Sequence, residues 1–115
     1  MPIPSEIQAL IDRLNRELDE IEQEATEGLN ILMRVISSFP ENVILVQYLA
    51  YLNALLLFVD TSRRQIEIIV ETLTPVDVPT STIQESGEDL GTLLGRVLEG
   101  KNRVEQIFNF LRGLP

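Results

Sequence analysis

The seventeen residues from Val43 to Val59 are apolar at every position except Gln47 and Asn53. A helix on the surface of a soluble protein needs only one apolar stripe, whereas a helix of this composition is apolar on all sides. Such a helix must be surrounded by other protein or by lipid. The rest of the chain is therefore expected to cover this stretch.

The segment 5–38 predicts a first long helix, because apolar or small residues recur at alternating steps of four and three. These residues are Ile7, Ile11, Leu14, Leu18, Ile21, Ala25, Gly28, Leu32, Val35 and Phe39. Ala25 and Gly28 are the smallest of them. We expect an aromatic side chain of the next helix, Tyr48, Tyr51 or Phe58, to fill the space beside them.

The segment 40–73 predicts a second helix of equal length with the same spacing. Its core positions are Leu45, Tyr48, Leu52, Leu55, Val59, Ser62, Ile66, Ile69 and Leu73. The intervening turn is too short for anything except an antiparallel hairpin. Many further apolar residues, including Leu49, Leu56, Leu57 and Phe58, lie off this spacing. One neighbouring helix cannot cover all of them.

Two prolines predict that residues 74–80 form an extended connector to a third helix over 81–112. The expected core positions of that helix are Ile83, Gly87, Leu90, Leu94, Val97, Lys101, Val104, Phe108 and Leu111. Gly87, Gly91 and Gly95 form one stripe, which favours close approach of a neighbouring helix. The alternative is a break or kink near Gly87–Gly91, since glycine destabilises a helix interior.

Capping boxes of the S-x-x-E/Q type predict the three helix starts. Ser5 with Gln8 precedes the first helix, and Ser38 with Glu41 precedes the second. Ser81 or Thr82 is expected to cap the third helix.

Charge excludes several classes of partner. The chain has 18 acidic and 9 basic residues, a net charge of −9. A nucleic-acid-binding surface is normally basic, and anionic lipid surfaces repel an acidic protein. Six acidic residues lie between Glu17 and Glu27. We expect a solvated helix face that basic residues of the other helices partly neutralise. Arg63 and Arg64 should lie within a turn of Asp12 and Asp19, and the level of Glu20 to Glu27 should be shared by Arg96, Lys101 and Arg103.

Catalytic motifs are missing from the sequence. The chain contains no histidine and no cysteine, which removes the commonest general base, metal ligand and thiol nucleophile. No glycine-rich phosphate loop or nucleophile elbow is present. We therefore expect no enzymatic activity, no metal and no cofactor. The N-terminus lacks a charged and an apolar region typical of a secretion signal, so we expect a cytoplasmic protein.

Taken together, the patterns predict an all-α fold in which residues 1–115 form one domain of three long helices in an up-down-up bundle with coiled-coil-like packing. The expected function is structural or assembly through helix–helix association, as a homodimer. The candidate interface residues are Leu49, Leu56, Leu57, Phe58, Gly87, Gly91 and Gly95. An adaptor that binds a partner's amphipathic helix and a membrane-associated protein remain alternatives, although Val43–Val59 is short for a membrane span.

Overall fold

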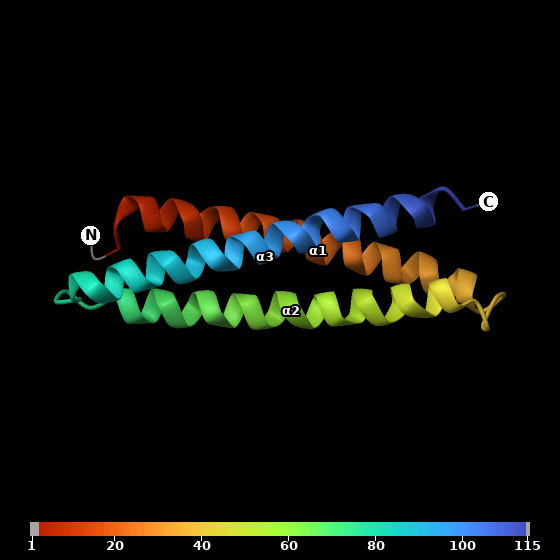
Figure 1. Ribbon diagram of the computed structural model, residues 1–115, viewed down its shortest axis with the longest axis horizontal. Coiled ribbons are helices and arrows are strands. Elements are labelled where there is room, and N and C mark those ends of the chain that lie inside the picture. The colour runs from red at the N-terminus through yellow and green to blue at the C-terminus, as the bar shows by residue number, and fades with distance from the viewer. Residues whose placement is uncertain (1–2, 115) are drawn as a thin grey trace.

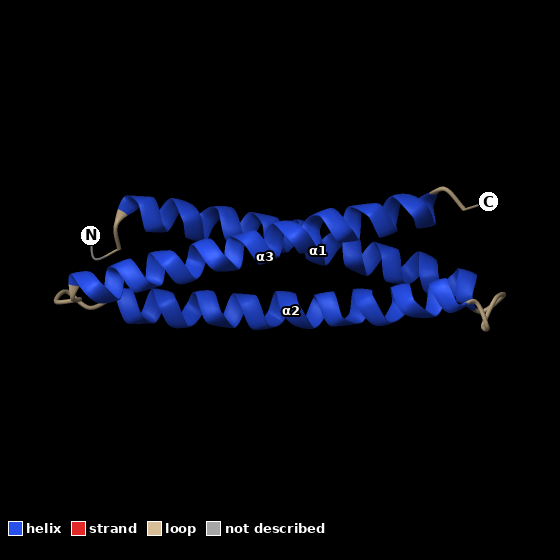
Figure 2. Cartoon of the chain, viewed as in Figure 1, coloured by secondary structure: helices blue, strands red, loops and turns tan. Residues whose placement is uncertain are grey.

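Three long helices form the molecule, and they run up, down and up along one axis (Figure 1). The computed structural model describes residues 3–114, and its helices are α1 (Ser5–Ile36), α2 (Val43–Leu73) and α3 (Thr80–Arg112). Only loops and turns connect them (Figure 2). The Cα atoms extend 59 × 19 × 17 Å. The predicted all-α bundle is confirmed.

The core residues of α1 and α2 follow the predicted spacing. All buried residues of α1 and of α2 are among the positions predicted from the sequence. Three predicted positions are not fully buried: Val35 and Tyr48 are half-buried, and Phe39 is exposed in the turn. The space beside Gly28 is filled by Leu52, Leu111 and Phe108. The prediction of an aromatic residue from α2 at this place was wrong, because α3 supplies the ring.

The core face of α3 is rotated relative to the prediction. Ile83 is half-buried, and the predicted Leu90, Val97, Val104 and Leu111 are buried. At the positions between them, the buried residues are Ser86, Leu93, Gly100 and Ile107, each one residue before the predicted Gly87, Leu94, Lys101 and Phe108. Both sets fit a helical repeat, because residues three and four positions apart lie on the same side. Packing against α1 and α2 buries the set that contains Ser86, Leu93, Gly100 and Ile107, not the predicted set.

Helix α3 is continuous from Thr80 to Arg112, so the break considered near Gly87–Gly91 is not present. The tertiary contacts of α3 on both sides of the glycines hold the segment helical. Burial of Leu90 and Leu93 between them contributes to this, since each buried leucine side chain stabilises by about 1.5–3 kcal/mol.

The predicted capping boxes are wrong at all three helix starts. Pro4 and Pro79 occupy the N-cap positions of α1 and α3, where no side-chain cap forms and the proline carbonyls accept hydrogen bonds from the next turn. Asn42 caps α2, and its side-chain oxygen accepts from the Leu45 amide at 3.1 Å. Proline fixes the extended backbone that precedes a helix, so Ser5 already lies inside α1. At the hairpin, α1 ends two residues earlier and α2 begins three residues later than predicted.

Candidate functional site

The outer side of α2 exposes several large apolar side chains, among them Val43, Ile44, Val46 and Leu57. By length and composition α2 could cross a membrane. Only 22% of its most apolar 18-residue stretch is buried in the bundle. Val43 is 65% exposed and Leu57 is 67% exposed. Helices α1 and α3 therefore cover one side of α2 and leave the other uncovered, as the excess of apolar residues predicted.

Heptad spacing defines the centre of this outer face. Val43, Ala50, Leu57, Arg64 and Glu71 recur every seven residues, and all five are exposed. Each precedes a buried residue of α2 by two positions, which is about 200° of rotation. They therefore point away from the core. The first three are apolar and the last two are charged, so the apolar surface covers the half of α2 nearest the α1–α2 turn.

The seven predicted interface residues lie on different sides of the molecule. Leu57 is on the outer face of α2, whereas Leu49, Leu56 and Phe58 are half-buried against the core. A Cβ on Gly87 would lie 3.9 Å from Ile7 of α1. Exposed Gly91 and Gly95 have no neighbouring side chain within 4 Å of an added Cβ. One chain does not bring these residues into a single surface.

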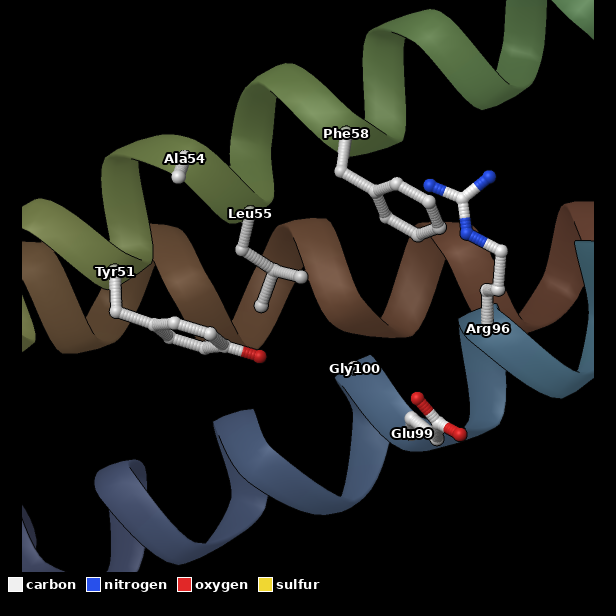
Figure 3. Close-up of a pocket in the computed structure, with 7 residues that line it drawn as sticks. All are labelled: Tyr51, Ala54, Leu55, Phe58, Arg96, Glu99 and Gly100. Carbon is white, nitrogen blue, oxygen red and sulfur yellow. The ribbon is translucent and has the colours of Figure 1, made fainter.

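A shallow groove between α2 and α3 was not predicted. Helix α1 packs more closely against α2 and α3 than these two pack against each other. The groove has a volume of about 260 Å³ and is lined by Tyr51, Ala54, Leu55, Phe58, Arg96, Glu99 and Gly100 (Figure 3). Leu55 occupies the space that a side chain at Gly100 would take, since a Cβ there would lie 3.1 Å from Cδ1 of Leu55.

Arginine–aromatic pairs bridge the groove at intervals of seven residues. The guanidinium carbon of Arg96 lies 5.2 Å from the ring centre of Phe58, and that of Arg103 lies 5.7 Å from Tyr51. Burial raises the pKa of Tyr51. Each pair has residue numbers that sum to 154, the register of an antiparallel pair. This register places each arginine level with its aromatic partner, but the sequence leaves the rotation of α3 about its own axis undetermined.

Ion pairs neutralise part of the acidic face of α1, as predicted. Arg63 binds Asp19 at 2.7 Å and Glu22 at 2.9 Å, and hydrogen bonding to Glu22 is the main cause that raises its pKa. Lys101 binds Glu17 at 2.9 Å and Glu20 at 2.8 Å. These acids therefore have basic partners within the chain.

Glu24 is the one carboxylate of residues 3–114 with a buried oxygen that lacks a hydrogen-bond partner. Burial raises its pKa, and the negative charges of Glu105 and Glu20 add to the rise. Because the folded-state pKa lies above the unfolded value, its ionisation opposes folding at neutral pH. Within the same residues, no three acidic side chains form a group that could hold a metal ion.

Replacing Gly91 or Gly95 by alanine is expected to stabilise the monomer by about 0.8–1 kcal/mol each, because alanine favours a helix interior and the added methyl meets no neighbour. Thermal unfolding at low protein concentration measures the gain. Gly100→Ala is the matched control, since its methyl must displace Leu55, and its gain should be smaller or absent. Equal gains at all three glycines would contradict the close contact at Gly100.

The chain matches no protein-family model, and no curated protein or solved structure matches it significantly.

Proposed function

We propose that this protein is a non-enzymatic structural or assembly protein that acts through helix–helix association, as a homodimer that buries the outer face of α2. The exposed apolar half of α2 carries this proposal. Monomeric soluble proteins rarely expose a continuous apolar surface of this kind without using it for binding. Symmetric pairing of identical surfaces is the commonest way in which soluble proteins bury one. The proposal places the protein in the cytoplasm, in keeping with its acidic, cysteine-free sequence.

Sedimentation equilibrium tests the proposal. We expect a reversible dimer at tens of micromolar, and Leu57→Glu should weaken the dimer at least tenfold, because it introduces two like charges into the apolar contact. Met33→Glu is the matched control, since Met33 is also exposed but lies on α1. A wild-type monomer at 100 μM, or equal effects of the two variants, would contradict the proposal.

A membrane-associated role is the second candidate, and the length and apolar composition of α2 favour it. In this case lipid replaces the second copy against Val43–Leu57. Expression followed by detergent-free fractionation separates the two roles. Recovery in the membrane pellet that resists high-salt and carbonate washing would support the membrane role, and recovery in the soluble fraction would reject it.

An adaptor role is the third candidate, favoured by the groove between α2 and α3. Its aromatic walls and arginines fit an amphipathic helix that carries acidic residues beside its apolar stripe. Chemical-shift changes in Tyr51 and Phe58 on titration with such a peptide would support this role. Changes confined to the outer face of α2, or none, would reject it.

A further inference from the structure

We infer that the homodimer is antiparallel, with α2 of one copy packed against α2 of the second copy and the two-fold axis passing between Asn53 and Ala54. This inference rests on the proposed function, because it specifies the geometry of that association.

Parallel pairing is opposed by charge. In a parallel pair with a two-fold axis along the helices, each residue on the outer face meets its own copy. Arg64 would then face Arg64, and Glu71 would face Glu71, while Asp60 would lie near Asp60 at the edge. Like charges placed directly opposite each other destabilise a helix pair. Repulsion in the charged half of α2 therefore disfavours the parallel pair, although the apolar half could pack in either orientation.

Three antiparallel registers centre the contact on the apolar half of α2. They differ in where the two-fold axis crosses the helix: at Ala50, at Leu57, or between Asn53 and Ala54. With the axis at Ala50, Asp60 of the second copy lies level with Pro40, next to Glu41, so that like charges come close together. With the axis at Leu57, Arg64 of the second copy lies over Ala50 and Glu71 over Val43. Both of these registers therefore place charge unfavourably.

The third register places the axis between Asn53 and Ala54, so that facing residues have numbers that sum to about 107. Ala50 then faces Leu57 of the second copy, so a large side chain fills the space left by a small one. The alanines at position 54 allow close approach, and the amides of Asn53 can pair across the axis. Sliding the two helices away from this register would leave the enclosed amides without a partner, which costs free energy.

Charge and exposed apolar groups at the edges agree with the same register. Arg64 lies level with Val43 of the second copy, two residues along the chain from Glu41 in the turn before α2. Its alkyl stem covers Val43. Ile68, which is 54% exposed, lies one helical turn beyond Arg64, on the side of the turn that precedes α2 of the second copy and contains Phe39, which is 60% exposed.

The size of the contact predicts a weak dimer. The overlap from Val43 to Arg64 is about 33 Å long and about 10 Å wide, or about 330 Å² in projection. Stable specific interfaces bury about 800 Å² per partner, so the dissociation constant should lie in the micromolar range. The test must therefore be performed at tens to hundreds of micromolar.

Single-cysteine variants test the orientation, because the natural chain has no cysteine. We expect an equimolar mixture of Ala50→Cys and Leu57→Cys to form disulfide-linked heterodimers, while neither variant links to itself. Identical positions lie about 10 Å apart along the axis in this register, beyond the Cα separation of about 7 Å that a disulfide allows. Self-linking of each variant would show parallel pairing and overturn the inference.

Charge reversal provides an independent readout. Glu41→Arg and Arg64→Glu should each weaken dimerisation about tenfold, since each replaces two attractive pairs by repulsive ones, and the double variant should restore it. A sedimenting dimer without the heterodimer crosslink and without this restoration would overturn the antiparallel geometry but leave the homodimer in place. A monomer in sedimentation would overturn both.

Discussion

Replacing Leu52 by alanine is expected to lower the free energy of unfolding of the monomer by about 3–4 kcal/mol, within the range of about 2–5 kcal/mol for a buried leucine. Leu52 is fully buried, and its Cδ1 atom fills the space beside Gly28. Neither Gly28 nor Ala25 has a side chain long enough to fill the resulting cavity. The cavity therefore stays open, and its free-energy cost adds to that of the lost apolar burial. In a domain with a total stability of about 5–15 kcal/mol, the melting temperature should fall by more than about 10 °C.

Leu57→Ala is the matched control for this substitution. The same atoms are removed five residues further along the same helix, where the side chain is 67% exposed. Its effect on the monomer should stay within about 0.5 kcal/mol. Urea unfolding below the dimer dissociation constant measures both variants. Similar losses at the two positions would contradict the placement of Leu52 inside and Leu57 outside.

Replacing Lys101 by methionine is expected to cost about 1–3 kcal/mol at neutral pH, the second-largest effect. Lys101 joins α3 to α1 through Glu17 and Glu20. The Glu17 side chain is only 14% exposed. Without the ammonium group, the carboxylate of this largely buried side chain would lose its basic partner. Chemical denaturation at pH 7 measures the loss.

The cost of this substitution should depend on pH. Hydrogen bonds to Glu20 and Glu17 raise the pKa of Lys101, so its stabilising contribution is complete below the unfolded-state pKa and is lost only as pH rises through the higher folded-state pKa. The hydrogen bond to Lys101 lowers the pKa of Glu20, so the contribution of this carboxylate is complete above its unfolded-state pKa and is lost as pH falls. The destabilisation in Lys101→Met should therefore be largest near neutrality and shrink below about pH 4.

A second substitution separates the unpaired carboxylate from lost packing. Glu17→Gln in the Lys101→Met background removes the unpaired charge, so the double variant should recover part of the lost stability. A loss that is the same at pH 7 and pH 3, without recovery in the double variant, would show that the lysine contributes only through its alkyl stem.

The core face of α1 could be predicted because it offers one consistent set of apolar positions. The first half of α2 is apolar on all sides, and its core face followed only because the same spacing continues into the polar second half. Leu14 and Leu18 each stand between two polar residues in the sequence, and Leu52 is followed by Asn53. The helical period therefore places these three leucines inside. The helix starts were less predictable. Pro4 and Pro79 stand at N-caps without a side-chain hydrogen bond, and Asn42, outside any S-x-x-E pattern, provides the cap of α2.

The candidate site was predicted only in outline. The excess of apolar residues on α2 indicated an uncovered surface, and Leu57 lies on it. The sequence could not show that Phe58 turns toward Arg96, or that Gly91 and Gly95 lie on the outer side of α3, far from a side chain. These placements depend on the rotation of α3 about its own axis, which local periodicity leaves undetermined.

The sequence by itself determined three helices, their order and the apolar excess of α2, because periodicity and proline positions act within each segment. Only the tertiary structure decided the buried side of α3. There, apolar residues adjoin at positions 93 and 94 and again at 107 and 108, so two faces fit the pattern equally well. Packing against α1 and α2 selected the face on which Gly100 admits Leu55 and Lys101 reaches two carboxylates. That choice leaves Val43–Leu57 as the open surface of the molecule.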